Sequence, residues 1–113
     1  MSYPHTKLKA YQKALSFHGH VIAIRKSLPR GLGDLADQLH RASTSVVLNL
    51  AEGASCRTPG TKRRHFDIAL ASAGECAAAL DLVALEVEAA TVPAAREDLE
   101  AIGALTTGLL RRL

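Results

Sequence analysis

Tryptophan is missing from this sequence, and other aromatic residues are scarce, because the 113 residues include only two Phe and two Tyr. Sheet proteins usually fill their cores with aromatic and β-branched side chains. Hydrophobic residues make up 48% of the chain, and much of that share is alanine, the best helix former. The composition therefore favours closely packed helices over a sheet. It also leaves a thin core for a lone domain, so we expect further burial at a subunit interface.

Cysteine and long apolar runs are equally sparse. Cys56 and Cys76 do not have the spacing of a metal site, and two cysteines are too few for a disulfide scaffold. Residues 1–10 are polar and basic, unlike a signal peptide, and no uninterrupted run of about 18 apolar residues is present. We therefore expect a cytoplasmic protein with reduced thiols and no membrane partner.

Recognisable catalytic and cofactor-binding motifs are also lacking. A di-iron site in a helical bundle needs inward carboxylates and Glu-x-x-His pairs on two helices, whereas the nearest match here is Asp37 with His40. His18 and His20 are two residues apart and so point to different sides of a helix. No serine or cysteine lies in a nucleophile motif, and the glycines form no phosphate-binding loop. We predict no metal, no cofactor and no catalytic residue; a composite site between subunits is the alternative.

Helical periodicity, in contrast, runs along nearly the whole chain. Apolar residues recur every three or four positions, with breaks at Pro29, at residues 54–61 and at Pro93. These breaks predict four helices, over residues 7–28, 34–53, 61–90 and 93–112. Short connectors and the absence of a strand pattern predict one domain over residues 1–113, an all-α up-down-up-down antiparallel four-helix bundle.

The predicted helices carry more apolar positions than a two-stranded seam needs. In the first helix two neighbouring stripes are apolar, one with Leu15 and Ile22 and the other with Phe17 and Val21. The N-cap of the third helix is either Thr58, with Pro59 at the first helical position, or Thr61. Its core positions follow a four-three alternation typical of coiled coils; they are Phe66, Leu70, Ala73, Ala77, Leu80, Ala84 and Val87.

Charge is unevenly divided along the chain. Residues 1–66 contain eleven Lys and Arg and three acidic residues, a net charge of +8, whereas residues 67–113 contain three and eight, a net charge of −5. Such asymmetry is typical of a nucleic-acid surface. It also fits head-to-tail association of identical subunits, with a positive face on a negative one. Solvated helix faces of differing charge are the third possibility.

Two groups of polar residues are candidate sites. The first is basic and dense beside a loop, which suits phosphate contacts, although a solvated basic turn gives the same pattern. Its members are Arg57, Lys62, Arg63, Arg64 and His65, and Arg41 on the preceding helix is a further candidate contact. The second is a predicted polar cluster at the end of the bundle, formed by Asn49, Glu52 and Glu75. Alternatively, Asn49 fixes the helix register and Glu52 ties down the connector.

Several motifs give the chain a family resemblance. They are Tyr11-Gln12-Lys13-Ala14-Leu15, Arg41-Ala42-Ser43-Thr44-Ser45-Val46, Asn49-Leu50-Ala51-Glu52-Gly53, and Phe66 followed by Ile68-Ala69-Leu70-Ala71-Ser72-Ala73-Gly74-Glu75. They resemble the bacterial four helix bundle protein family, also called the 23S ribosomal RNA intervening-sequence protein family, which includes the accessory variability proteins of diversity-generating retroelements. The resemblance implies an antiparallel four-helix bundle that assembles as a ring-like homopentamer. For the retroelement branch it further implies nucleic-acid binding and partnership with a reverse transcriptase.

These observations together predict a non-enzymatic, homo-oligomeric accessory protein that binds RNA or DNA through a basic surface. The alternative is a self-assembling scaffold or protein–protein interaction module with no nucleic-acid ligand. A hydrolase or metalloenzyme is the third hypothesis, and no motif in the sequence favours it.

Overall fold

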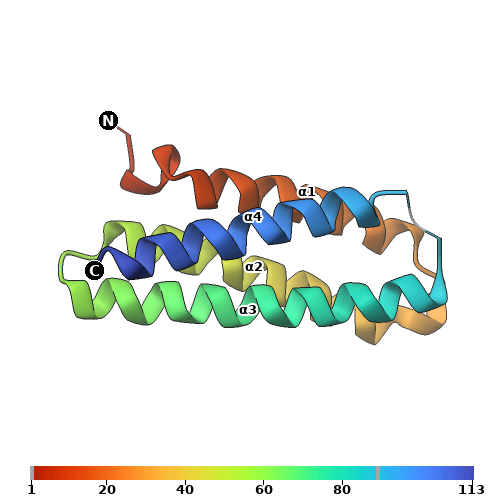
Figure 1. Ribbon diagram of the computed structural model, residues 1–113. Coiled ribbons are helices and arrows are strands. Elements are labelled where there is room, and N and C mark those ends of the chain that lie inside the picture. The colour runs from red at the N-terminus through yellow and green to blue at the C-terminus, as the bar shows by residue number, and fades with distance from the viewer. Residues whose placement is uncertain (1, 89) are drawn as a thin grey trace.

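A computed structural model of the chain consists of four long helices and two short 3₁₀ helices (Figure 1). It describes residues 2–88 and 90–113, and no strand occurs within those ranges. In chain order the elements are η1 (Pro4–Lys7), α1 (Lys9–Ser27), η2 (Arg30–Leu32), α2 (Gly33–Ser55), α3 (Pro59–Glu86) and α4 (Val92–Arg111). Met1, in the segment compared with a signal peptide, and Ala89, in the range predicted for the third helix, lie outside the described residues.

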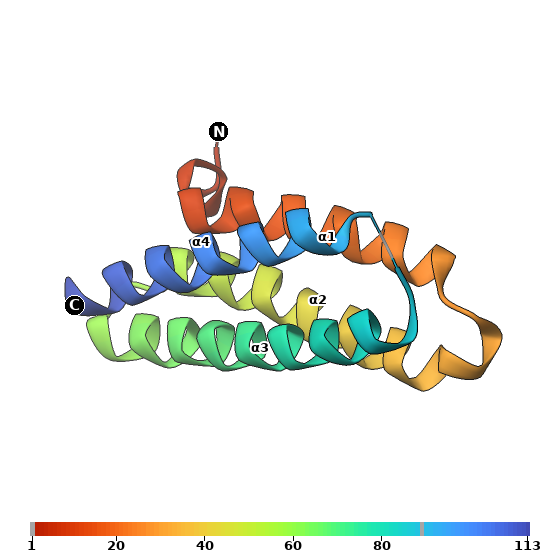
Figure 2. The same ribbon diagram turned by 45° about the vertical axis from the view of Figure 1, so that its right-hand side comes forward.

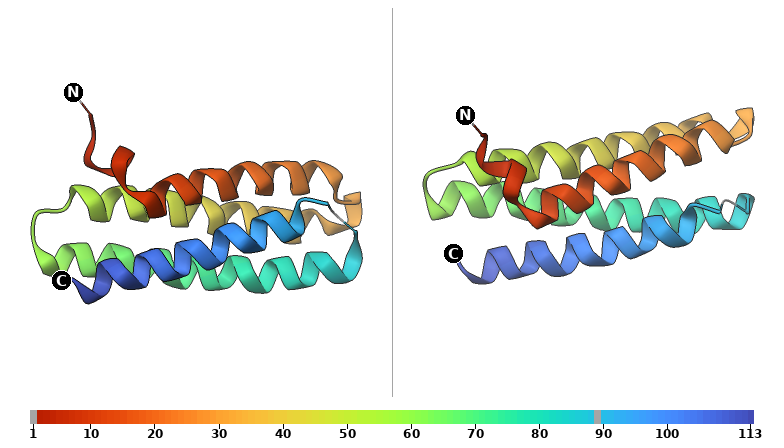
Figure 3. Two further views of the ribbon diagram at one scale, coloured as in Figure 1. Left: turned by 45° about the horizontal axis from the view of Figure 1, so that its top comes forward. Right: turned by 90° about the horizontal axis from the view of Figure 1, so that it is seen from above.

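The four helices form an antiparallel bundle of up-down-up-down topology. α1 packs on α2, α2 on α3, α3 on α4 and α4 on α1, while among the described residues no Cα atoms approach within 8 Å across either diagonal. Two further orientations show the helices running side by side along the bundle (Figures 2 and 3). The bundle measures 44 × 26 × 21 Å. The predicted fold class is confirmed.

Helix α3 starts earlier and ends sooner than the periodicity predicts. Its N-cap is Thr58, whose Oγ1 accepts a hydrogen bond from the backbone N–H of Thr61 at 3.3 Å, and Pro59 occupies the first helical position. This geometry decides between the two possible caps, because proline fits the first turn, where its missing N–H costs nothing. At the other end Val87 adopts an extended backbone, so α3 stops at Glu86.

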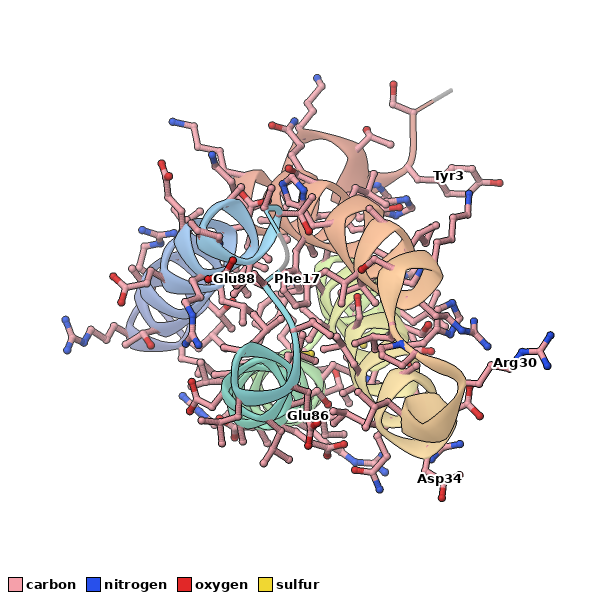
Figure 4. The ribbon with its side chains drawn as sticks, turned by 90° about the vertical axis from the view of Figure 1, so that its right-hand side faces the viewer. Tyr3, Phe17, Arg30, Asp34, Glu86 and Glu88 are labelled. Carbon is pink, nitrogen blue, oxygen red and sulfur yellow. The ribbon has the colours of Figure 1, made fainter. Side chains whose placement is uncertain are left out.

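The core lies along the axis shared by the four helices. In α1 the stripe with Phe17 and Val21 is fully buried, whereas Leu15 and Ile22 on the neighbouring stripe remain exposed. Viewed along the bundle, Phe17 lies between the helices (Figure 4). The apolar width that the sequence shows on α1 therefore exceeds what one bundle buries.

The seam predicted for α3 is partly wrong. Ala77 and Ala84 are exposed, and the core positions are one residue earlier, at Ala69, Cys76 and Val83. A helix packed in a square bundle buries a wider stripe than a two-stranded coiled coil does. Because α3 is apolar on several sides, the four-three spacing alone does not identify the side that faces inward.

Helix α3 is also long and apolar enough, by composition, to cross a membrane. Its most apolar 18-residue window has a mean hydropathy of 1.7, although charged residues interrupt every long apolar run. A core helix of a bundle passes the same test, and 33% of the window is buried against the rest of the bundle.

Candidate nucleic-acid interface

Three segments that are distant in the sequence meet at one end of the bundle. The N-terminal segment, the α2–α3 connector and the C-terminal end of α4 lie together there (Figures 1 and 3). Lys7, Lys9 and Arg112 line one shallow groove of about 160 Å³ between η1, α1 and α4. From the connector side, Arg63 Nη2 donates to the carbonyl of Leu113 at 3.3 Å. These contacts place basic residues from all three segments side by side.

This end of the bundle is strongly basic. We call it the basic end and define it by its seven exposed cations, which are Lys7, Lys9, Arg57, Arg63, Arg64, Arg111 and Arg112. The acidic residues on the same segments are Glu52 and Asp67, and Glu52 lies 3.2 Å from Nδ1 of His65. Positive charges gathered on one surface raise the local concentration of anionic partners.

The opposite half of the bundle carries most of the acidic residues. They are Asp34, Asp37, Asp81, Glu86, Glu88, Glu97, Asp98 and Glu100. Two arginines there are already paired, Arg25 with Asp37 at 3.0 Å and Arg96 with Asp81 at 2.7 Å. Figure 4 looks onto this end, where Asp34, Glu86 and Glu88 lie together with Arg30. Charge is therefore separated along the long axis of the molecule.

The five predicted nucleic-acid contacts occupy three different environments. Arg57, Arg63 and Arg64 are exposed at the basic end. Lys62 Nζ instead donates to the carbonyls of Gly53 at 3.0 Å and Ala54 at 3.1 Å. An ammonium group at the last carbonyls of a helix donates to acceptors that have no partner within the helix. Its positive charge also interacts favourably with the negative end of the helix dipole. Lys62 thus closes the C-terminal end of α2.

Arg41 does not join the basic end. It lies on the exposed side of α2, fourteen residues before Ser55, which corresponds to about 21 Å of helix. Conversely, sequence reasoning missed Lys7, Lys9, Arg111 and Arg112. Their signal was the topology itself, because four antiparallel helices return both chain ends to the end that holds the α2–α3 connector.

The predicted polar cluster forms in part, around a residue not assigned to it. His65 Nδ1 lies 3.0 Å from Asn49 Oδ1 and 3.2 Å from Glu52 Oε2. Both neighbours are acceptors, so Nδ1 carries the proton and donates. The Asn49 amide donates in turn to the Ser45 carbonyl at 2.9 Å, and the hydroxyls of Ser45 and Ser72 are 2.7 Å apart. These bonds join α2 to α3 and fix their register.

Glu75 lies outside this cluster. Its side chain is exposed, and among the described residues no hydrogen bond or ion pair connects it to Asn49 or Glu52. The Glu75 carboxylate affects the pKa of the neighbouring residue, Cys76. Burial, and secondly the nearby Glu75 carboxylate, raise the pKa of the Cys76 thiol to about 12. Glu75 therefore belongs to the outer surface of α3.

The close approach of α2 and α3 depends on Gly53. A methyl group added at Gly53 would stand 2.5 Å from Cε1 and 2.7 Å from Cδ1 of Phe66. Carbon atoms in contact normally lie about 3.5–4.0 Å apart. The Phe66 ring thus occupies the space that any other residue at position 53 would need, directly beside the His65 cluster.

His18, His20 and His40 lie at contacts between the long helices. His18 Nδ1 lies 2.8 Å from Ser43 Oγ, and its ring centroid is 5.0 Å from that of His40. Burial, and then the proximity of His40, lower the pKa of His18. His20 Nε2 lies 3.4 Å from the buried Asp98. Across residues 2–88 and 90–113, no three His, Cys, Asp or Glu side chains converge as a metal site would require.

Comparison with known protein families gives a clear assignment. The family model described as "23S rRNA-intervening sequence protein" matches residues 6–106. The chain belongs to this family. The match includes α1, α2, α3 and most of α4. No curated protein matches the chain. In this member of the intervening-sequence protein family, Asn49, Glu52 and Gly53 of α2 meet His65 and Phe66 of α3.

Proposed function

We propose that this intervening-sequence family protein is a non-enzymatic, cytoplasmic homo-oligomer, a pentamer, that binds RNA or DNA through its basic end. The observation that carries the proposal is the convergence of seven exposed cations from three separate segments. The family resemblance supports the pentamer. It also suggests a reverse transcriptase as a protein partner. We propose no membrane partner.

Phosphate is the ligand chemistry that suits the basic end best. Arginine and lysine side chains supply most sequence-independent contacts to nucleic acids, and their guanidinium groups fit phosphate oxygens bidentately. Arg57 projects from the α2–α3 connector and Arg63 and Arg64 from the first turns of α3, while Lys7 and Lys9 lie across the groove from Arg112. The cations thus surround the end of the bundle, and a nucleic acid lying across it meets several of them at once.

Salt dependence provides the test. We expect the protein to bind structured RNA and duplex DNA at about 50 mM salt and to lose affinity steeply at higher concentrations, because phosphate contacts release counterions. Fluorescence anisotropy measures the affinities. Replacing Arg63 and Arg64 together by glutamate should lower the affinity and reduce the slope of log affinity against log salt by about 2.

A matched pair of variants controls for net charge. Arg57→Glu at the basic end and Arg30→Glu at the opposite end change the charge equally, and both positions are exposed. We expect Arg57→Glu to weaken binding, whereas Arg30→Glu should leave it nearly unchanged. Equal effects of the two variants, or no binding by the parent protein at low salt, would refute the proposed interface.

The second candidate function is a scaffold that assembles without nucleic acid. It is favoured by the large apolar side chains that α1, α2 and α3 leave exposed. Under this hypothesis light scattering shows an oligomer, and neither RNA nor DNA binds at any salt concentration.

A further inference from the structure

Six large apolar side chains on the helices are exposed. They are Leu15 and Ile22 on α1, Leu48 on α2, and Ile68, Leu82 and Leu85 on α3. Isolated exposed leucines are common on protein surfaces. Here, however, Leu48 is 55% exposed, Leu82 53% and Leu85 84%. The six residues also lie on only two surfaces of the bundle. Such grouping of exposed apolar side chains is typical of a protein–protein interface.

The first surface is a straight row along the solvent side of α3. We call it the outer stripe; its residues are Ile68, Ala71, Glu75, Ala78, Leu82 and Leu85. All six are exposed, and their spacing alternates between three and four residues. That is the spacing by which a helix presents a seam to another helix. The core positions of α3 are a different set, so this second seam has no partner within the described chain.

The second surface lies where α1 and α2 meet. A shallow groove of about 90 Å³ is lined there by Leu15, His18, Thr44, Val47 and Leu48. Small-molecule pockets usually enclose about 300–1,000 Å³, so this groove suits one aliphatic side chain better than a ligand. Arg41 lies on the same side of α2 as Leu48, two helical turns earlier. We call this surface, with Ile22 and Arg41, the α1–α2 face.

We propose that the outer stripe of one copy packs on the α1–α2 face of the next copy, with Glu75 paired to Arg41. The proposal depends on the homo-oligomer of the proposed function and names the surfaces that build it. Both charges are exposed, and neither has an ion-pair partner among the described residues of its own chain. Opposite charges inside an otherwise apolar contact fix its register.

The register follows from the bundle itself. The hydroxyls of Ser45 and Ser72 are 2.7 Å apart, so these two residues lie at one level of the antiparallel pair α2–α3. Four residues earlier on α2, Arg41 is then level with the position that follows Glu75 on α3.

In the other direction along α2, Leu48 is likewise level with the position that follows Ile68. Rotation about a ring axis parallel to the bundle keeps every residue at its level. In such a ring Glu75 therefore lies at the level of Arg41 on the neighbouring copy, and Ile68 at the level of Leu48, so each pair can meet across the contact.

A symmetric contact between two outer stripes is disfavoured by the same residues. Glu75 lies near the middle of the stripe, so an antiparallel pairing of two α3 helices would bring two glutamates close together. Like charges facing each other across an interface are destabilising. The contact is therefore heterologous, and repetition of a heterologous contact builds a ring or a filament.

Charge exchange between the two surfaces tests the pairing. Glu75→Arg alone and Arg41→Glu alone should each weaken self-association at least about tenfold, whereas the double variant should regain much of it. Sedimentation velocity measures the assembly. Glu97→Arg, at an exposed position of α4, is the control for the change in charge and should assemble like the parent protein.

A mixing experiment tests the direction of the contact. Ile68→Asp with Leu82→Asp removes the outer stripe, and Leu48→Asp removes the α1–α2 face. Each variant alone should be monomeric, because each lacks one of the two surfaces. An equimolar mixture should form a heterodimer and nothing larger, since each variant supplies the surface that the other lacks. Circular dichroism of each variant verifies that the helices remain folded at these exposed positions.

Different results overturn different claims. A parent protein that is monomeric throughout the micromolar range refutes both this contact and the oligomer of the proposed function. An oligomer that is unaffected by Glu75→Arg and Arg41→Glu refutes only the contact. Variants that both stay monomeric when mixed, or a Leu48→Asp variant that still assembles alone, also refute it.

Discussion

The packing of Phe66 on Gly53 can be tested by a single methyl group. In Gly53→Ala the new Cβ would lie 2.5 Å from the Phe66 ring, so the ring must tilt or α2 and α3 must move apart. Phe66 is only 3% exposed and is surrounded by core residues. Overpacking of this kind usually costs about 1–3 kcal/mol. Replacing glycine by alanine within a helix returns up to about 1 kcal/mol.

The balance predicts that Gly53→Ala lowers the free energy of unfolding by about 1–2 kcal/mol. Urea denaturation followed by far-UV circular dichroism measures it, at one fixed protein concentration because assembly also contributes to stability. Gly103→Ala is the matched control. Gly103 lies inside α4, and an added Cβ would meet no atom within 4 Å apart from its chain neighbours and the adjoining backbone of its own helix, so this substitution should stabilise the protein by up to about 1 kcal/mol.

A second substitution distinguishes the clash from a general effect on α2. Phe66→Leu removes the ring atoms that an alanine at position 53 would strike, at the cost of core volume. The double variant should therefore be more stable than the sum of the single effects predicts, by about 1 kcal/mol or more. Strict additivity, or a stabilising Gly53→Ala, would show that the two helices do not approach as closely as the structure indicates.

Three further perturbations follow from individual side chains. Lys62→Met removes the charged donor at the end of α2 and should cost about 1–2 kcal/mol of unfolding free energy, while weakening nucleic-acid binding less than Arg57→Glu does; the reverse order would contradict its structural role. A maleimide at neutral pH should label Cys56 rapidly and Cys76 only after unfolding, because burial raises the pKa of Cys76 to about 12; two fast thiols would contradict this. The pKa of His18 is lowered from 6.5 by burial, so its contribution to stability is complete above that value and is lost as the pH falls through the lowered pKa. His18→Gln should therefore lose less stability than the parent protein between about pH 7.5 and pH 5, and equal losses would contradict the assignment.

The number and order of the helices could be predicted because breaks and periodicity are local signals. Pro29, residues 54–61 and Pro93 interrupt the pattern, and no segment shows the period-two alternation of a strand. The orientation of α3 could not be predicted in the same way. Ala69 and Cys76 are no more apolar than Leu70 and Ala77, so only the positions of the other helices decide which pair is buried.

The candidate site shows the same division between local and tertiary information. Local density identified Arg57, Arg63 and Arg64, whereas the charges contributed by the two chain ends required the topology of the bundle. The role of Lys62 depends on its reach to two carbonyl groups of another helix, which no sequence pattern encodes. Glu75 has a polar side chain inside an apolar segment, but its exposure was decided by the face of α3 that turns inward.

The basic end and the proposed contact between copies have a joint consequence. The bundle is basic at one end and acidic at the other, and the proposed contact runs along its sides. A symmetric antiparallel dimer would point its basic ends in opposite directions. In a cyclic ring of parallel bundles every basic end faces the same side, so one nucleic acid can contact several subunits at once. Linked sites of this kind can raise affinity by about 10²–10⁴-fold without any new contact. Loss of the Glu75–Arg41 pairing should therefore weaken nucleic-acid binding even though each basic end remains intact.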